Sequence, residues 1–467
     1  MRQLAWWTVV SAVLILSACG GGSGGGGKGA GEGGGGAAGG AGGLGGSDDV
    51  GGGGDGGSVG EGGSGGEDGS GPLQIRGTTV NHKGNPLSDV IVVLNRDLER
   101  IQVSGRTGDF SFTDVTPPYD LVVSGFGAFI ELRGLTRSNP IIAISEGGQF
   151  SCANEVRGDI DGAPDPLPDG DVILVATTGE DFEASPISGP LESFSAPILW
   201  FGAQERTVDL VAAHVVQNMA DGSFSFKGAG KVSGVEMAHS GVVEGLQIEL
   251  SEDPIETRTT ELRTSFGSYG AEASSSILRF DVLGASFAFA PGSPWRLPEE
   301  DGIEFPTGGG AFYVQGKAVS GTYASRIRKA ELGGVTEMEL PQFESLKAIL
   351  PQAGAVDVSR SPTLIWAPAE GARAYWVRIR ETLGGGVDRN FFLPGDATHL
   401  SLAGLEAIGG GLDPDTEYSW SVLATPSRNL YEADAVADGS GIATYRYLFA
   451  DDLLILQSAA TSFTTGR

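Results

Sequence analysis

The stretch Leu412-Asp413-Pro414-Asp415-Thr416-Glu417-Tyr418-Ser419-Trp420-Ser421-Val422 decides the fold class of this chain. It passes from a turn rich in Asp and Pro into a segment in which every second residue is apolar. Such alternation is typical of a β-strand with one buried face. Short segments of this kind, separated by Gly, Pro, Asn and Asp at spacings of roughly 8–12 residues, recur from Leu73 onward. The pattern predicts an all-β chain of serial β-sandwich modules.

Residues 345–467 resemble a fibronectin type III domain. Pro362–Pro368 looks like its second strand with Trp366 in the core, Ala374–Arg380 alternates like its third, and Ala460–Thr465 fits its closing strand. Leu412–Val422 resembles the tyrosine corner, in which a tyrosine hydroxyl bonds back to the backbone. The segment between Ala424 and Ala459 is longer than the hairpin expected there, so either a further hairpin is inserted or the strand assignment is shifted.

Residues 73–145 resemble the carboxypeptidase-regulatory-like, transthyretin-like Ig domain. The resemblance follows a strand at Ile75–Val80, a glycine turn, a strand at Val90–Leu94, then Thr107–Phe112 and Pro117–Val123 in that order. It implies a small structural or adhesive β-sandwich, not a peptidase.

Residues 146–344 form the least legible region, in which we expect one or two β-rich units of no assigned family. Strands are expected at Val156–Ile160, Asp171–Ala176, Thr207–Val216, Phe224–Phe226, Gly245–Leu250, Ser276–Phe280 and Ala311–Val314.

The amino-terminal segment predicts an anchor. Arg2 precedes an apolar run at Leu4–Leu16, and Leu16-Ser17-Ala18-Cys19 resembles the lipobox of bacterial lipoproteins. The resemblance implies a signal peptide at 1–18 and a Cys19 that carries fatty acids such as palmitate. An ordinary secretory signal and an uncleaved membrane helix are the alternatives. Residues 19–72, rich in glycine after Cys19 with Ser, Ala and scattered Asp and Glu, predict a disordered tether. Because Gly20 is not acidic, the resemblance favours the outer over the inner membrane.

Charge and cysteine content exclude some classes. A net charge of −29 is repelled by phosphate backbones, so we expect no nucleic-acid partner. Once Cys19 is lipidated, Cys152 is the remaining thiol, and no intramolecular disulfide is possible. We expect Cys152 to be a buried apolar residue.

Several residues of the types that bind metals or phosphate occur in the chain. His82, His214, His239 and His399 lack metal-ligand spacing, and Gly228-Ala229-Gly230-Lys231 lacks the Ser/Thr and the helix of a phosphate loop. Asp159, Asp161, Asp165, Asp169 and Asp171 could supply oxygen ligands to calcium, although Gly170 stands where an EF-hand requires glutamate. The alternative is a plain Asp/Pro-rich connection.

Clustered carboxylates and aromatic residues each allow a functional and a structural explanation. Glu299-Glu300-Asp301 and Asp451-Asp452 could serve a glycosidase, with solvated loop charge as the simpler explanation. Trp200, Phe201, Trp295, Tyr313 and Tyr323 are candidates for a sugar-binding face, although most such residues in sandwiches are core.

Taken together, the sequence predicts a lipid-anchored cell-envelope protein that acts as a non-catalytic binding or structural scaffold. No catalytic, cofactor-binding or metal-binding residue is assigned, and no cofactor is expected. Any partner beyond the membrane would be an envelope protein or polysaccharide. The alternatives are a carbohydrate-active enzyme with its site in residues 146–344, and an adhesin stabilised by calcium at Asp159–Asp171.

Overall fold

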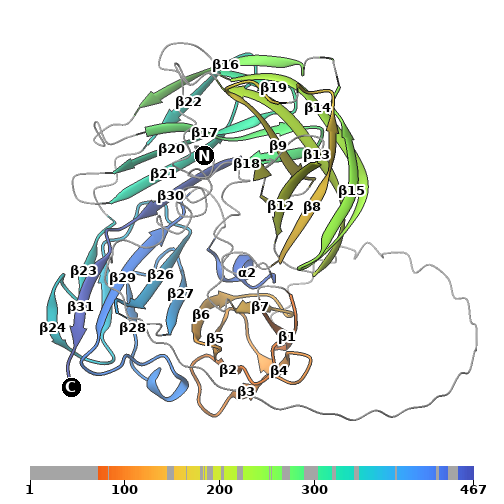
Figure 1. The fold of residues 1–467 in the computed structure, drawn as a ribbon. Helices are drawn as coiled ribbons and strands as arrows, with labels where there is room; N and C mark the ends of the chain where they lie inside the picture. The colour runs from red at the N-terminus through yellow and green to blue at the C-terminus, as the bar shows by residue number, and fades with distance from the viewer. Residues whose placement is uncertain are drawn as a thin grey trace, which may run out of the picture. The chain divides into compact units, whose positions relative to one another are not determined.

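A computed structural model describes residues 72–81, 84–144, 152–164, 166–178, 182–183, 185–186, 193–200, 204–217, 224–251, 253, 255–265, 274–288, 303–317, 322–340, 346–383, 387–426, 431–439 and 451–467 (Figure 1). Their regular structure is almost entirely β-strand, with short helical turns at η4 (Glu406–Ile408) and α2 (Ala433–Val436). The all-β prediction is therefore confirmed. The signal segment, Cys19 and the glycine-rich segment lie outside the described residues.

The first sandwich packs two sheets around one core. The strands are β1 (Leu73–Asn81), β2 (Ile91–Leu94), β3 (Ile101–Val103), β4 (Asp109–Val115), β5 (Tyr119–Gly125), β6 (Ala128–Leu135) and β7 (Ile141–Ile144). One sheet has the order β4-β1-β7, and the other runs β3-β2-β5-β6. Phe110 and Phe112 alternate with exposed residues on β4 and are buried in this core, as the pattern at Thr107–Phe112 predicts.

The second sandwich is formed by part of residues 146–344, for which the sequence predicts β-rich units of no assigned family. The strands are β8 (Cys152–Asp161), β9 (Asp171–Thr177), β10 (Phe182–Glu183), β11 (Ser185–Pro186), β12 (Phe194–Trp200), β13 (Glu205–Gln217), β14 (Phe224–Ala238) and β15 (Val242–Glu249). The sheets have the orders β10-β12-β8-β15 and β11-β9-β13-β14. Apolar residues of both sheets, Cys152 and Trp200 among them, form a separate core.

A third unit follows. The strands are β16 (Thr257–Ser265), β17 (Ser274–Val282), β18 (Ala285–Ala288), β19 (Ile303–Pro306), β20 (Gly310–Lys317), β21 (Tyr323–Lys329) and β22 (Val335–Glu339). One sheet has the order β19-β16-β22, and the other runs β18-β17-β20-β21. The strands expected in residues 146–344 are all present.

The last sandwich has the strand arrangement expected of a fibronectin III-like module. Its strands are β23 (Ala348–Leu350), β24 (Ala355–Val358), β25 (Thr363–Trp366), β26 (Ala374–Glu381), β27 (Asp388–Pro394), β28 (His399–Ser401), β29 (Glu417–Ala424), β30 (Asp452–Gln457) and β31 (Thr461–Thr465). The sheet β23-β25-β28 faces β27-β26-β29-β31. The hydroxyl of Tyr418 accepts a hydrogen bond from the Asp413 amide at 2.9 Å, which forms the expected tyrosine corner.

The long segment after Ala424 ends in a strand that belongs to two units. Strand β30 pairs antiparallel with β21 from Tyr323↔Gln457 to Arg328↔Asp452, and its other edge meets β29 at Leu423↔Gln457. Figure 1 shows β30 lying between β21 and β29. Strand β30 therefore completes the sheet of the third unit, whereas Tyr445–Phe449, the other part of the expected insertion, lie outside the described residues.

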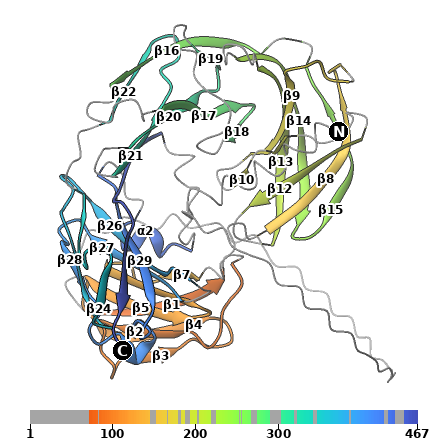
Figure 2. The same ribbon diagram turned by 60° about the vertical axis from the view of Figure 1, so that its left-hand side comes forward.

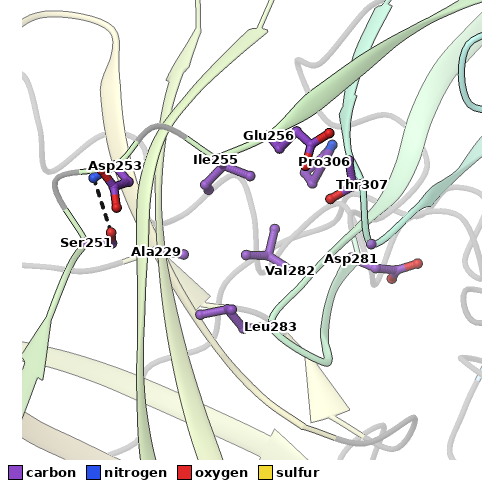
Figure 3. Close-up of a pocket in the computed structure, with 11 residues that line it drawn as sticks. Ala229, Ser251, Asp253, Ile255, Glu256, Asp281, Val282, Leu283, Pro306 and Thr307 are labelled. Atoms are coloured by element: carbon purple, nitrogen blue, oxygen red, sulfur yellow. Dashed lines mark hydrogen bonds between the residues drawn. The ribbon is translucent and has the colours of Figure 1, made fainter.

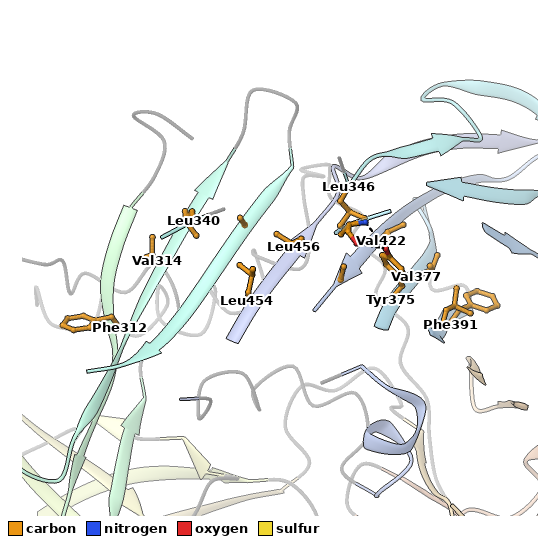
Figure 4. Packing of buried hydrophobic residues seen from close by; sticks show 14 of the residues in the cluster. Phe312, Val314, Leu340, Leu346, Tyr375, Val377, Phe391, Val422, Leu454 and Leu456 are labelled. Atoms are coloured by element: carbon orange, nitrogen blue, oxygen red, sulfur yellow. Dashed lines mark hydrogen bonds between the residues drawn. The ribbon is translucent and has the colours of Figure 1, made fainter. Parts of the chain in front are cut away.

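Buried leucines hold that junction together. Leu456 is fully buried and Leu454 nearly so, and both belong to one apolar cluster that extends from Phe312 and Val314 to Tyr375. Figure 4 shows Leu454 and Leu456 between the strands that carry these groups. Burial of this kind stabilises the junction between the third unit and the last sandwich by about 25 cal/mol per Å² of apolar surface removed from water.

The first and last sandwiches are joined as well. Strand β6 pairs parallel with β27 from Ala128↔Asp388 to Leu132↔Phe392. Trp376 and Phe392 of the last sandwich lie in the core of the first, beside Ala433 and Val436 of α2. Helix α2 contacts β6 and lies near β7 in both views (Figure 1, Figure 2). One hydrogen-bonded ladder therefore runs β18-β17-β20-β21-β30-β29-β26-β27-β6-β5-β2-β3. The sequence predicts the sandwiches but not this ladder.

Candidate functional site

A pocket of about 300 Å³ lies where the end of the second sandwich meets the third unit. Its lining combines apolar side chains with three carboxylates. The lining residues are Ala229, Ser251, Asp253, Ile255, Glu256, Asp281, Val282, Leu283, Pro306, Thr307 and Gly308 (Figure 3).

Two tight turns position the lining side chains. The β17–β18 hairpin turns at Leu283 (φ 49°) and Gly284 (φ 84°), a pair of left-handed residues that suits the twist of a two-residue hairpin. It leaves Leu283 exposed at the pocket. The second turn, Pro306–Gly309, is held by the Thr307 amide, which donates to the Glu256 carbonyl oxygen at 3.0 Å. A Cβ at Gly308 would come within 2.3 Å of the Asp281 carbonyl oxygen, so this turn requires glycine.

The carboxylates of the pocket differ in their surroundings. Asp281 is half-buried, accepts a hydrogen bond from the Ser286 hydroxyl at 2.7 Å and lies 3.2 Å from the guanidinium of Arg279. Asp253 and Glu256 are exposed, and the Asp253 amide donates to the Ser251 hydroxyl oxygen. A buried cation thus balances Asp281, while the rim keeps two solvated acids. The pocket offers shape and negative charge to a cationic group rather than a desolvated general acid.

The structure accounts for the carboxylates at Asp451-Asp452 by ion pairing. Asp451 bonds to Arg279 at 2.9 Å, and Asp452 lies 3.3 Å from the guanidinium of Arg326. Both pairs fix the start of β30 to the third unit. Glu299, Glu300 and Asp301 lie outside the described residues. Asp451 and Asp452 are both more than half exposed, so the described pair is surface charge that also forms ion pairs with the third unit.

The acidic stretch considered for calcium is spread over two strands. Asp159 and Asp161 lie on β8, Asp171 begins β9, and Asp165 is outside the described residues. Asp171 Oδ2 is 2.7 Å from Nε2 of the buried His214 on β13. Within the described ranges, no group of three His, Cys, Asp or Glu side chains could hold a metal ion.

The glycines at Gly228-Ala229-Gly230 lie in the middle of strand β14, not in a loop. A Cβ at Gly230 would lie 2.2 Å from the Glu249 carbonyl oxygen, and one at Gly228 would lie 2.5 Å from that of Ser251. Small residues are needed here because two backbones approach closely. The Lys231 ammonium pairs with Asp209 at 2.7 Å. The motif therefore lies within a strand and has a packing role.

The other singled-out side chains are mostly structural. Cys152, Trp200 and Tyr313 are buried, Tyr323 is partly exposed, and Phe201 and Trp295 lie outside the described residues. His239 accepts a hydrogen bond from the Ala153 amide through Nδ1, His399 is exposed on β28, and His82 is undescribed. Burial raises the pKa of Tyr313 to about 12. No aromatic platform for sugars is formed by these described residues.

Sequence reasoning missed the pocket. Its acids lie in two segments, Asp253 and Glu256 in one connection and Asp281 at the end of β17, so no local motif predicts the site. The one local signal is Val282-Leu283-Gly284-Ala285, in which a glycine after an apolar residue marks a tight turn.

No described helix is long and apolar enough to cross a bilayer.

Comparisons with known proteins give fold-level similarity of low extent. No protein-family model and no curated protein matches the chain. Among solved structures, the FN1–FN3 domains of chicken CNTN1 align at 12% identity over 75% of this chain and 94% of that one, with a TM-score of 0.16. The Bacillus anthracis TIE protein aligns at 8% identity over 58% of this chain and 50% of that one, with a TM-score of 0.14.

BcpA, the major pilin subunit of Bacillus cereus, aligns at 8% identity over 58% of this chain and 98% of that one, with a TM-score of 0.14. Alignments this weak say nothing of partners or activity. The assignment of β-sandwich modules is based on the strand order of this chain itself.

Proposed function

We propose that the chain is a lipid-anchored cell-envelope protein that serves as a non-catalytic binding or structural scaffold. Its fatty acids would be attached at Cys19, its signal segment removed, and its location the outer rather than the inner membrane. Support for the anchor comes from the lipobox resemblance at Leu16–Cys19 and from Gly20 after it. Its partner would be an envelope protein or polysaccharide.

The observation that carries the scaffold role is the ladder that joins three of the four units. A chain of loosely tethered sandwiches loses orientational freedom each time two of them bind one partner. Units joined by strand pairs β6–β27 and β21–β30 have already lost it. Pre-organisation of this kind leaves more of the contact energy for binding.

The character of the pocket supports a non-catalytic role. A retaining or inverting glycosidase needs one carboxyl group kept protonated by an apolar setting and a second facing it. Asp253 and Glu256 are exposed, and Asp281 is paired with Arg279. None of these carboxyl groups has an apolar setting.

Detergent phase partitioning tests the anchor. The wild-type chain should enter the detergent phase, Cys19→Ser should stay in the aqueous phase, and mass spectrometry of the wild-type amino-terminal peptide should find the added acyl chains. If both proteins remain aqueous, the anchor proposal fails.

A separate assay tests the non-catalytic role. The purified Cys19→Ser protein should release no reducing sugar from a panel of envelope polysaccharides, and Asp253→Asn and Glu256→Gln should behave identically. Release that disappears in either variant would replace the scaffold with the enzyme alternative and would leave the anchor untouched.

A further inference from the structure

The pocket where the second sandwich meets the third unit presents apolar surface to water. Its volume of about 300 Å³ lies at the lower end of the range for small-molecule sites. Ala229 and Val282 are buried and Ile255 is partly buried, whereas Leu283 is 52% exposed. A ligand that covers Leu283 would remove apolar surface from water, which favours the binding of a hydrocarbon chain.

Leu283 has this exposure at a backbone position that suits other residue types. It has a φ of 49° in the two-residue turn between β17 and β18. Asn, Asp and Gly are usual at such a position, because a bulky side chain is strained in the left-handed region. The turn itself therefore does not account for a leucine here, whereas contact with an apolar ligand would.

The carboxylates of the pocket have room for a cation. Asp281 is paired with the buried Arg279, which also contacts Asp451 at 2.9 Å. Asp253 and Glu256 are exposed, and neither forms an ion pair with a described residue. Two exposed acids thus remain beside an apolar surface, where a cationic ligand gains both kinds of contact.

The basic residues nearby leave these acids open. Besides Arg279, the cations that lie two residues from a lining residue are Lys227, Lys231 and Arg258. Lys231 pairs with Asp209 at 2.7 Å. Lys227 and Arg258 are exposed and form no ion pair with a described acid. Among the described residues, no cation of the protein therefore occupies the place of a ligand's charge at Asp253 or Glu256.

The acids lie on two sides of the apolar residues. Figure 3 shows Asp253 on one side of Ile255 and Val282, and Glu256 and Asp281 on the other. In agreement, no group of three His, Cys, Asp or Glu side chains in the described ranges could hold a metal ion. One small cation cannot meet these carboxylates together, whereas a longer ligand with a positive charge at each end can.

We propose that the pocket binds an aliphatic diamine or polyamine, with its methylene chain against Leu283 and its ammonium groups at Asp253 and Glu256. An ammonium group carries three N–H donors, which carboxylates approaching from separate directions can accept. A guanidinium fits less well, since it prefers a planar contact with both oxygens of one carboxylate, and Arg279 already holds Asp281. The proposal rests on the non-catalytic role proposed above, and not on the lipid anchor.

Isothermal titration calorimetry of full-length Cys19→Ser protein tests the two charged ends. At low ionic strength, 1,5-diaminopentane should bind about fivefold more tightly than n-pentylamine, which has the same chain and one charge. It should also bind more tightly than magnesium, a dication without a chain, and added salt should weaken it. Equal affinity for the diamine and the monoamine, or for the diamine and magnesium, would overturn the proposal.

Acid variants separate the pocket from the general attraction of cations to a chain with a charge of −29. Asp253→Asn and Glu256→Gln should each weaken diamine binding about fivefold, because each removes one ion pair at the protein surface. The matched control is Glu236→Gln, which removes an exposed carboxylate from another part of β14 and should leave the affinity unchanged. The same loss in all three variants would show non-specific binding and overturn the site.

Leu283→Asn tests the apolar contact without disturbing the hairpin. Asn tolerates the left-handed conformation, so circular dichroism should be unchanged. Diamine binding should weaken because the methylene chain loses its apolar partner. A folded Leu283→Asn protein that binds as tightly as its parent would contradict the proposed pose.

Mass spectrometry of the amine after incubation distinguishes this proposal from the proposed function. The diamine should be recovered unchanged. A chain that binds no diamine and still partitions into detergent when lipidated loses this ligand and keeps the anchored scaffold role. Consumption of the diamine would overturn the non-catalytic role on which the proposal rests.

Discussion

Arg96 donates hydrogen bonds from Nε and Nη2 to the fully buried carboxylate of Glu131, at 3.0 and 2.7 Å. Its Nη1 reaches the Ser401 carbonyl oxygen, and Arg133 approaches Glu131 from the other side at 2.6 Å. A charge inside the first sandwich is thus balanced by a side chain that also bonds to the last one. Removing the Arg96 side chain therefore affects both the first and the last sandwich.

Arg96→Met is expected to lower the free energy of unfolding by about 3 kcal/mol, because it leaves a buried carboxylate with one cation instead of two. Urea titration is the suitable measurement, since urea does not screen charge. Arg76→Met, which removes an exposed guanidinium bonded to Gln74, should change stability by less than about 0.5 kcal/mol. Equal effects at the two positions would contradict the role given to Arg96.

Asp434→Ala should loosen the junction between α2 and the first sandwich. The Asp434 carboxylate accepts from the Thr136 amide at 3.0 Å and from the Thr136 hydroxyl at 2.5 Å. Their loss should cost roughly 1–3 kcal/mol and speed hydrogen exchange at Thr136. The matched control is Glu432→Ala, which removes an ion pair with the half-exposed Arg373. Unchanged exchange at Thr136 would show that other contacts hold the junction.

Leu456→Asp should destabilise the third unit as well as the last sandwich, because β30 pairs with a strand of each. It places a charge at a fully buried position where β30 lies between β21 and β29. We expect a loss of more than about 3 kcal/mol, with faster hydrogen exchange in β21, in a different unit of the chain. Leu383→Asp is the exposed control. Protection in β21 that survives Leu456→Asp would mean that the third unit does not need β30.

Gly158→Ala and Gly234→Ala separate steric cost from conformational cost. A Cβ at Gly158 would lie 2.0 Å from the Leu246 carbonyl oxygen, whereas Gly234 has open space but a φ of 72°. Gly234→Ala should lose about 1 kcal/mol, the cost of a left-handed residue with a side chain. Gly158→Ala should lose several times more, because β8 and β15 must separate. Thermal unfolding of both variants gives the ratio directly.

Tyr313 makes stability depend on pH at the alkaline end. Burial raises its pKa to about 12, above the value of about 10 for an exposed tyrosine. The folded chain therefore keeps a proton that the unfolded chain releases, so the stability is fully present below pH 10 and is lost as pH rises toward 12. Tyr313→Phe should flatten stability against pH in that window. An unaltered slope would show that other tyrosines govern it.

Local signals predicted the sandwiches, and only contacts between distant segments reveal how they join. Alternation and turn residues located β13, β20 and β29, and the corner at Tyr418 could be named from its neighbours in sequence. The register β6–β27 could not, because parallel edge pairing leaves no periodic trace in either strand. The same holds for the pocket, in which Asp253 and Glu256 of one connection lie near Asp281 of another segment.

Strand β30 also determines when folding of the chain can be completed. Its partner β21 is synthesised long before it, and pairing must wait until the intervening last sandwich exists. Contacts of such sequence separation make folding slow. For a chain that is exported before it folds, as we propose for this protein, β21 and β30 stay apart until the whole polypeptide has crossed the membrane.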